Sequence, residues 1–170
     1  MTRPLPHRIT VLALAFSALF LCARPTRATD IMGTISNTMV ISDDSELVGD
    51  VTCTVTKAPC IAFGASGIKL RLNGFSITGS ATDCTASTAT DGIDAVGQSD
   101  VAILGPGLVQ KFAVFGIALM QATKVRVEGV TTTDNCFSGI ILIATTDSDI
   151  ERNLSVRNSM HSGGNPCGGT

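Results

Sequence analysis

Tryptophan and tyrosine are both absent from this 170-residue chain, and aromatic residues make up only 4% of it. Exposed Trp and Tyr rings, which have an apolar face and a polar edge, are the usual platform for stacking against sugars. That platform is missing here. The chain also has no long run of good helix formers after residue 30, whereas Gly, Thr, Ser, Val and Ile are abundant. This composition favours β-structure with many turns.

Zinc-type cysteine spacing is absent as well, because the sequence contains no CxxC and no Cys/His pairing of that kind. Five cysteines lie after residue 28. Cys53 and Cys60 are close enough in sequence to close a small disulfide loop. The odd count leaves one thiol unpaired, or paired with a partner outside the chain.

Long apolar runs are limited to one, from Ile9 to Leu21, which follows Arg3 and Arg8. The phrase "CARPTRA" comes next and ends at Ala28. A basic start, an apolar middle and small residues at a cleavage point are typical of a secretory signal peptide, here residues 1–28. The run is short for a membrane span, which needs roughly 20 residues. We therefore expect a secreted, periplasmic or cell-envelope protein with no membrane span after cleavage.

Charge is sparse, since only 15% of residues are Asp, Glu, Lys or Arg. Cleavage after Ala28 would leave eight basic and fourteen acidic residues, a net charge of −6. An acidic chain of this kind is a poor partner for nucleic acids and for anionic membranes.

A repeat of about two dozen residues is the strongest positive signal. Gly-Ile recurs at residues 67, 92, 116 and 139, in steps of 25, 24 and 23 residues. Apolar residues alternate with polar ones within each phrase, as in half-buried strands. The leucine-rich repeat phrase is absent, whereas strand, turn, strand, turn is the pattern of a parallel β-helix.

Stacking of such coils predicts columns of inward side chains. One column contains Ile93, Ile117 and Ile140, and a second contains Ala95, Leu119 and Leu142. A third is predicted for Ile77, Ile103, Val127 and Ile150. Asparagine tolerates the left-handed backbone of tight corners and can hydrogen-bond between coils, so we expect Asn135, Asn153 and Asn158 at corners.

The domain plan that follows is an all-β solenoid of about four coils. Residues 29–51 are expected to form an N-terminal cap or first strands, and residues 52–158 the β-helix repeats. Residues 159–170 are a Gly-rich tail or the start of a further, incomplete coil.

The phrases "RLNGFSITG", "VAILGPGLVQKF", "FGIALMQATKVRVEGVTTTDN" and "GIILIATTDSDIERNLSVRN" resemble right-handed parallel β-helix repeat proteins of the pectin-lyase-like superfamily. The similarity covers roughly residues 47–158. It implies a right-handed parallel β-helix, but this fold carries lyases, hydrolases, epimerases, adhesins and non-catalytic proteins. The Asn-Thr-Asp, Gly-His-Gly and Arg-Ile-Lys phrases of the related hydrolases are not present in order.

Acidic residues near the last repeat offer the first candidate site. The 23-residue offset places Lys124 over Asp147, Arg126 over Asp149 and Glu128 over Glu151. Alternating signs predict a surface charge ladder, in which each pair contributes about 0.2–1 kcal/mol. The alternative is a calcium site or a general acid/base pair, for which Arg126, Glu128, Asp149 and Glu151 are the candidates. The like-charge pair Glu128–Glu151 is the one contact that the ladder does not explain.

The tail "SMHSGGNPC" offers the second candidate, because Met160, His161 and Cys167 are soft ligands of the kind that bind copper. A single His in an irregular loop more commonly has no such role, so no cofactor is expected.

A non-catalytic extracellular or envelope module for binding or scaffolding is the function that these observations favour. A polysaccharide or a cell-surface component is the expected partner. The alternative is a degenerate or truncated polysaccharide lyase or hydrolase of the same superfamily.

Overall fold

The computed structural model describes residues 28–81, 84 and 90–159, and this part of the chain folds into strands and turns. That part of the chain contains no helix, and therefore no helix able to cross a membrane. The strands are β1 (Thr29–Ile35), β2 (Met39–Ile41), β3 (Ser45–Cys53), β4 (Ile61–Phe63), β5 (Lys69–Arg71), β6 (Ser76–Thr78), β7 (Ile93–Val96), β8 (Ala102–Gln110), β9 (Phe115–Met120), β10 (Arg126–Thr133), β11 (Ser138–Ile143), β12 (Asp149–Glu151) and β13 (Leu154–Val156).

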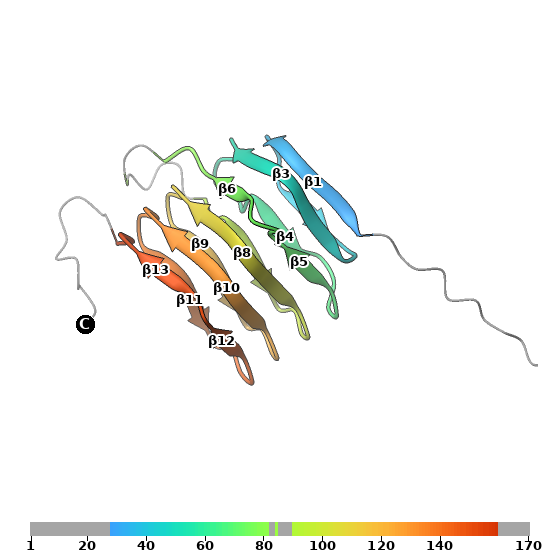
Figure 1. The fold of residues 1–170 in the computed structure, drawn as a ribbon. Coiled ribbons are helices and arrows are strands. Elements are labelled where there is room, and N and C mark those ends of the chain that lie inside the picture. Colours follow the sequence, from blue (N-terminus) through green and yellow to red (C-terminus); the bar gives the residue numbers. More distant parts are fainter. Residues whose placement is uncertain (1–27, 82–83, 85–89, 160–170) are drawn as a thin grey trace, which may run out of the picture.

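Two parallel sheets form the molecule, as in a parallel β-helix (Figure 1). Sheet A has the order β1-β3-β5-β8-β10-β12, with β6 between β3 and β8 and with β13 beside β10. Sheet B has the order β11-β9-β7-β4-β2. The chain passes repeatedly from one sheet to the other, so each strand pairs with its counterpart in the next coil. The β-solenoid predicted from the alternating pattern is therefore present.

The core consists of stacked apolar columns between the sheets. Ile93 pairs with Ile117 and Ile117 with Ile140, as predicted. Ala95, Leu119 and Leu142 form the second predicted column. Ile93 and Ile117 are completely buried. These columns hold the coils together because a single coil buries little apolar surface by itself.

The third predicted column is correct for Ile103, Val127 and Ile150 but wrong for Ile77. Ile77 pairs with Val51 and Val109, whereas the partner of Ile103 on that side is Leu70. The error arose because the first repeat was aligned with the later ones by its Gly-Ile pair, which is not equivalent to theirs. Gly67-Ile68 precedes a strand of sheet A, whereas Gly92-Ile93 begins a strand of sheet B, where its counterpart is Ile61.

Left-handed backbone recurs at the coil corners, in columns of residues one coil apart. Asp100, Lys124 and Asp147 have φ of 57°, 55° and 52°. A second column contains Lys111, Asp134 and Arg157, at 58°, 55° and 50°. Asn135, Asn153 and Asn158 lie at corners, as predicted, but their own backbone is not left-handed. The left-handed residues directly precede them, at Asp134, Arg152 and Arg157.

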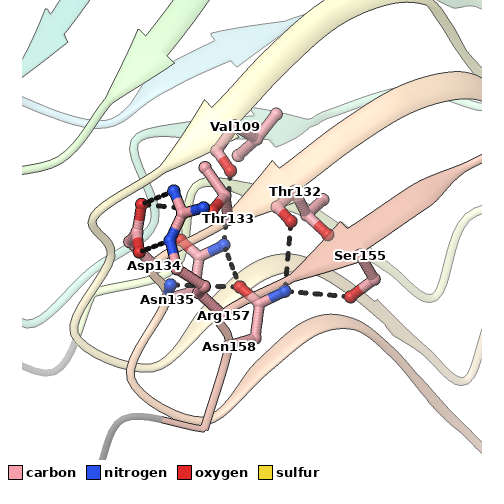
Figure 2. A network of polar contacts seen from close by, with 8 residues as sticks. All are labelled: Val109, Thr132, Thr133, Asp134, Asn135, Ser155, Arg157 and Asn158. Atoms are coloured by element: carbon pink, nitrogen blue, oxygen red, sulfur yellow. Dashed lines mark hydrogen bonds and ion pairs between the residues drawn. The ribbon is translucent and has the colours of Figure 1, made fainter.

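The corner asparagines instead form a ladder of side-chain hydrogen bonds (Figure 2). Asn135 is completely buried, and its Oδ1 accepts the Phe112 N–H. Its Nδ2 donates to the Val109 carbonyl and to Asn158 Oδ1. Asn158 repeats this arrangement by donating to the Thr132 carbonyl and to Ser155 Oγ. The ladder supplies hydrogen-bond partners to backbone groups at the corner, where the chain leaves one sheet and has not yet entered the other.

An ion pair lies beside this ladder. Arg157 Nε and Nη2 each donate to Asp134, both at 2.9 Å. The hydrogen bond from Arg157 lowers the pKa of Asp134. This bidentate contact joins two adjacent coils at the surface.

Two disulfides connect parts of the solenoid. Cys53, at the end of β3, is joined to Cys60, directly before β4. Cys84 is joined to Cys136, a pairing that the sequence left open. Disulfides are typical of proteins that fold in an oxidising environment outside the cytoplasm.

Candidate functional site

The outer face of sheet A carries the charged side chains in two adjacent columns. One column runs through Lys69, Ala102, Arg126 and Asp149, and the other through Glu46, Arg71, Leu104, Glu128 and Glu151. The alternation of the strands points these residues outward, because Leu70, Ile103 and Val127 between them are completely buried. Four coils therefore contribute charge to one surface.

Glu128 is the centre of an ion-pair network. Its Oε2 contacts Arg126 Nη2, and its Oε1 contacts Arg152 Nη2. Arg152 Nη1 lies 3.5 Å from Glu151 Oε2. The like-charge contact between Glu128 and Glu151 is therefore bridged by a guanidinium. Sequence reasoning missed the role of Arg152, because the left-handed backbone at that residue (φ 53°) departs from strand alternation.

A hollow of about 360 Å³ lies next to this network on the same face. Its lining comprises Arg71, Leu104, Gly105, Pro106, Glu128 and Gly129. Gly105 and Gly129 in this lining let the backbones of two coils approach closely. A Cβ on Gly105 would lie 2.0 Å from the Gly129 carbonyl oxygen, and Gly129 has a left-handed φ of 68°. The strand register shifts between Glu128 and Val130, at this same level.

Arg71 and Glu128 differ in what they can offer to a ligand. Both carboxylate oxygens of Glu128 are already in ion pairs. No acid within the described part of the chain forms an ion pair with Arg71, and its side chain is exposed. The hollow therefore presents a guanidinium beside the apolar surfaces of Leu104 and Pro106. Such a surface suits an anionic group attached to a ring or chain.

The residues that the 23-residue offset aligned do lie together, and the sequence favoured a charge ladder among them over a calcium site or an acid/base pair. The pairs Arg126–Asp149 and Glu128–Glu151 are in register, as the 23-residue offset predicts. The arginines around Glu128 favour the charge ladder over a general acid/base pair. Among the described residues no cluster of three His, Cys, Asp or Glu side chains could hold a metal ion. Met160, His161 and Cys167 lie outside the described residues.

A carboxyl pair that sequence reasoning missed lies on the other sheet. Asp94 is on β7, and Asp91 precedes that strand in the phrase "DGIDAV". Asp91 Oδ1 accepts the Phe115 N–H at 2.9 Å, and the two carboxyl groups hydrogen-bond to each other. Asp94 Oδ1 is buried with no donor near it. A hydrogen bond between two carboxyl groups requires a proton on one of them, which agrees with the raised pKa of both groups.

Burial, with the negative charge of Asp91 as a second cause, raises the pKa of Asp94 to about 7. Burial also raises the pKa of Asp91. The register neighbours of Asp94 on either side are Ala62 and Ala118, which supply no compensating charge. The only sequence signal for this pair was an acid at a strand position otherwise flanked by core residues.

Stability is therefore expected to fall as the pH rises from 5 to 8. The folded state keeps a proton on Asp94 that the unfolded chain has already lost above pH 4, so deprotonation favours unfolding. Between pH 5 and pH 8, the free energy of unfolding of the wild type should fall by about 1–2 kcal/mol more than that of Asp94→Asn. The difference is limited to this size because Asp94 is partly exposed and solvent screens its charge. Urea unfolding of both proteins in dilute solution at several pH values measures this difference.

Asp50 provides the control for this experiment. Hydrogen bonds from the Ser76 backbone and hydroxyl lower its pKa, so Asp50 is ionised throughout the pH range tested. Asp50→Asn should keep the wild-type decline between pH 5 and 8. A decline that persists in Asp94→Asn would contradict the assignment of the pH dependence to Asp94.

Comparison of this chain with family models, with curated proteins and with solved structures finds no match.

Proposed function

We propose that this chain is a secreted or cell-envelope binding module that recognises an anionic polymer through the outer face of sheet A. The observation that carries this proposal is Arg71, an exposed guanidinium without an ion pair among the described acids, at the wall of a hollow. A carboxylate or sulfate group of a polysaccharide, or of another cell-surface component, would accept two hydrogen bonds from it. The extended face of a solenoid suits a ligand that is itself extended.

The proposal includes the finer features expected from the sequence. These are a cleaved signal peptide over residues 1–28, a right-handed β-helix of about four coils with an N-terminal cap, and membership of the pectin-lyase-like superfamily. A non-catalytic role is preferred because the carboxylates nearest the hollow are neutralised. Glu128 contacts two arginines, and Glu151 lies beside Arg152. A polysaccharide lyase or hydrolase needs carboxylates or bases that can exchange protons with a substrate.

Arg71→Ala is expected to weaken binding to an acidic polysaccharide about 10- to 100-fold, since a charge-assisted hydrogen bond contributes about 1.5–3 kcal/mol. Residues 29–170 would be titrated by calorimetry with polygalacturonate and, in parallel, with a neutral galactan. Binding should be stronger for the acidic polymer and should weaken as salt increases.

Arg157→Ala is the matched control, because Arg157 is also exposed but is paired with Asp134 outside the hollow. It should bind as the wild type does. Equal losses for the two variants, or equal binding of both polymers, would contradict the proposed site. Release of unsaturated or reducing sugar by the wild-type chain would instead support the enzymatic alternative.

A further inference from the structure

The outer face of sheet A carries its charge unevenly from coil to coil, and strand β5 is its cationic row. Lys69 and Arg71 point outward on either side of the completely buried Leu70. No acid within the described part of the chain forms an ion pair with either side chain. The two cations leave the strand at positions about 7 Å apart, so both can reach one anionic group.

The acids beside β5 leave these cations unpaired because hydrogen bonds direct them to other donors. Glu46 is the register partner of Arg71, but its Oε2 accepts a hydrogen bond from Asn73 Nδ2 at 3.1 Å. Asp44 Oδ1 accepts the backbone N–H of Lys69 at 3.0 Å. The two carboxylates form a row of negative charge about 4.8 Å from β5, on the side away from the hollow.

The coil on the other side of β5 carries no charge at the matching positions, because its outward residues are Ala102 and Leu104. In the coil after that, Arg126 is already in contact with Glu128. The last described coil is acidic again, at Asp149 in the same column as Arg126. Along this face an anionic group is therefore attracted at β5 and repelled one coil before it. In the two coils that follow β5 it meets only neutral or paired side chains at these positions.

We propose that Lys69 and Arg71 together bind a single anionic group of the ligand, and that the ligand is a polymer whose anionic groups are separated by neutral units. Lys69 is then a second binding residue, and Glu46 selects the spacing of the charges; both roles rest on the proposed function. The guanidinium holds a carboxylate or sulfate through two parallel hydrogen bonds, and the ammonium group adds a point charge. The unit that carries this group lies over Leu104 and Pro106 in the hollow.

Glu46 disfavours a polymer that carries a charge on every unit. When one anionic group lies on Arg71, the next group toward the preceding coil lies over Glu46, because successive coils are only about 4.8 Å apart. Repulsion there subtracts from the attraction at β5, and an unfavourable contact of this kind is a common source of specificity. A neutral unit in the same place is not repelled, and its hydroxyl groups can donate to the carboxylate.

Two polygalacturonates with the same number of methyl esters test the spacing. In the random polymer the esters are scattered, and in the block polymer they are contiguous, so only the separation of the carboxylates differs. Calorimetry of residues 29–170 at low salt should show about 3-fold or more tighter binding to the random polymer. Glu46→Gln, which keeps an acceptor for Asn73, should bring the two affinities within about 2-fold of each other. Glu151→Gln is the matched control: Glu151 is in the same column, three coils from Arg71, and its loss should leave the preference unchanged.

Lys69→Gln should weaken binding to the random polymer about 3- to 10-fold, less than Arg71→Ala does, because an ammonium group makes no bidentate contact. Lys57→Gln is the matched control. Lys57 is also exposed but lies in the loop between β3 and β4, so this variant should bind as the wild type does. Circular dichroism checks that each variant is folded.

The possible results separate this inference from the proposed function. Equal or tighter binding of the wild type to the block polymer would overturn the selection of spacing by Glu46. Unchanged binding by Lys69→Gln, or equal losses for Lys69→Gln and Lys57→Gln, would overturn the two-residue site. Either result would leave the proposed function standing as long as Arg71→Ala still weakens binding to acidic polymers. If no acidic polymer bound to the wild type, both would be refuted.

Discussion

Leu119→Ala is expected to lower the free energy of unfolding by about 2–5 kcal/mol, whereas Leu142→Ala should cost less than half as much. Both leucines belong to the same inward column, one coil apart. Leu119 is completely buried between Ala95 and Leu142, so truncation leaves a cavity that its neighbours cannot fill. Leu142 is 44% exposed in the last described coil, where water already reaches part of the side chain. Urea unfolding monitored by circular dichroism gives both values.

This pair of variants tests the stacking itself, because residue type and column are held constant. Equal losses would mean that the last described coil is covered as fully as the inner ones. A loss below 1 kcal/mol for Leu119→Ala would contradict a core made of stacked columns. Equal m-values would show that neither variant changes the surface exposed on unfolding.

Two faces of one solenoid thus differ in chemistry. Sheet A carries Arg71 and the Glu128 network, which suit a polar, anionic ligand. Sheet B carries the apolar side chains of Val96, Met120 and Ile143. Both properties arise from the same rule: outward positions recur at every second residue of each strand and stack from coil to coil. A substitution at one outward position therefore alters one face and leaves the other unchanged.

The sequence predicted the columns well wherever a coil repeats without insertion. Ile93, Ile117 and Ile140 were correctly aligned because the steps of 24 and 23 residues connect true counterparts. The step of 25 from Gly67 to Gly92 joins positions on different sheets, because Ile61 is the counterpart of Ile93, 32 residues away. Spacing alone could not reveal this, since a Gly-Ile pair suits a strand entry on either sheet.

Two features of the site were not predicted from the sequence, because they depend on local backbone geometry and on the register between coils. Alternation predicted that Arg126 and Glu128 face outward, but Arg152 reaches Glu128 from a left-handed corner. The Asp91–Asp94 pair depends on burial and on Ala62 and Ala118 in adjacent coils. Such neighbours are fixed only by the three-dimensional register.

Asn135→Ala is expected to destabilise the protein by about 2–4 kcal/mol, although the substitution removes no apolar packing. Asn135 Oδ1 accepts the Phe112 N–H, and Nδ2 donates to the Val109 carbonyl. Because the Asn135 site is completely buried, no water replaces the lost amide, and each backbone group left without a partner costs about 1–3 kcal/mol. Thermal and urea unfolding of the variant measure the loss.

Asn158→Ala is the control from the same ladder. Asn158 pairs with the Thr132 carbonyl and with Asn135, but it is only half-buried in the last described coil. Water can solvate the groups that its removal exposes, so we expect a smaller loss than for Asn135→Ala. If both variants lost less than 1 kcal/mol, the corner amides would contribute little. The coils would then be held together by their apolar columns and strand hydrogen bonds alone.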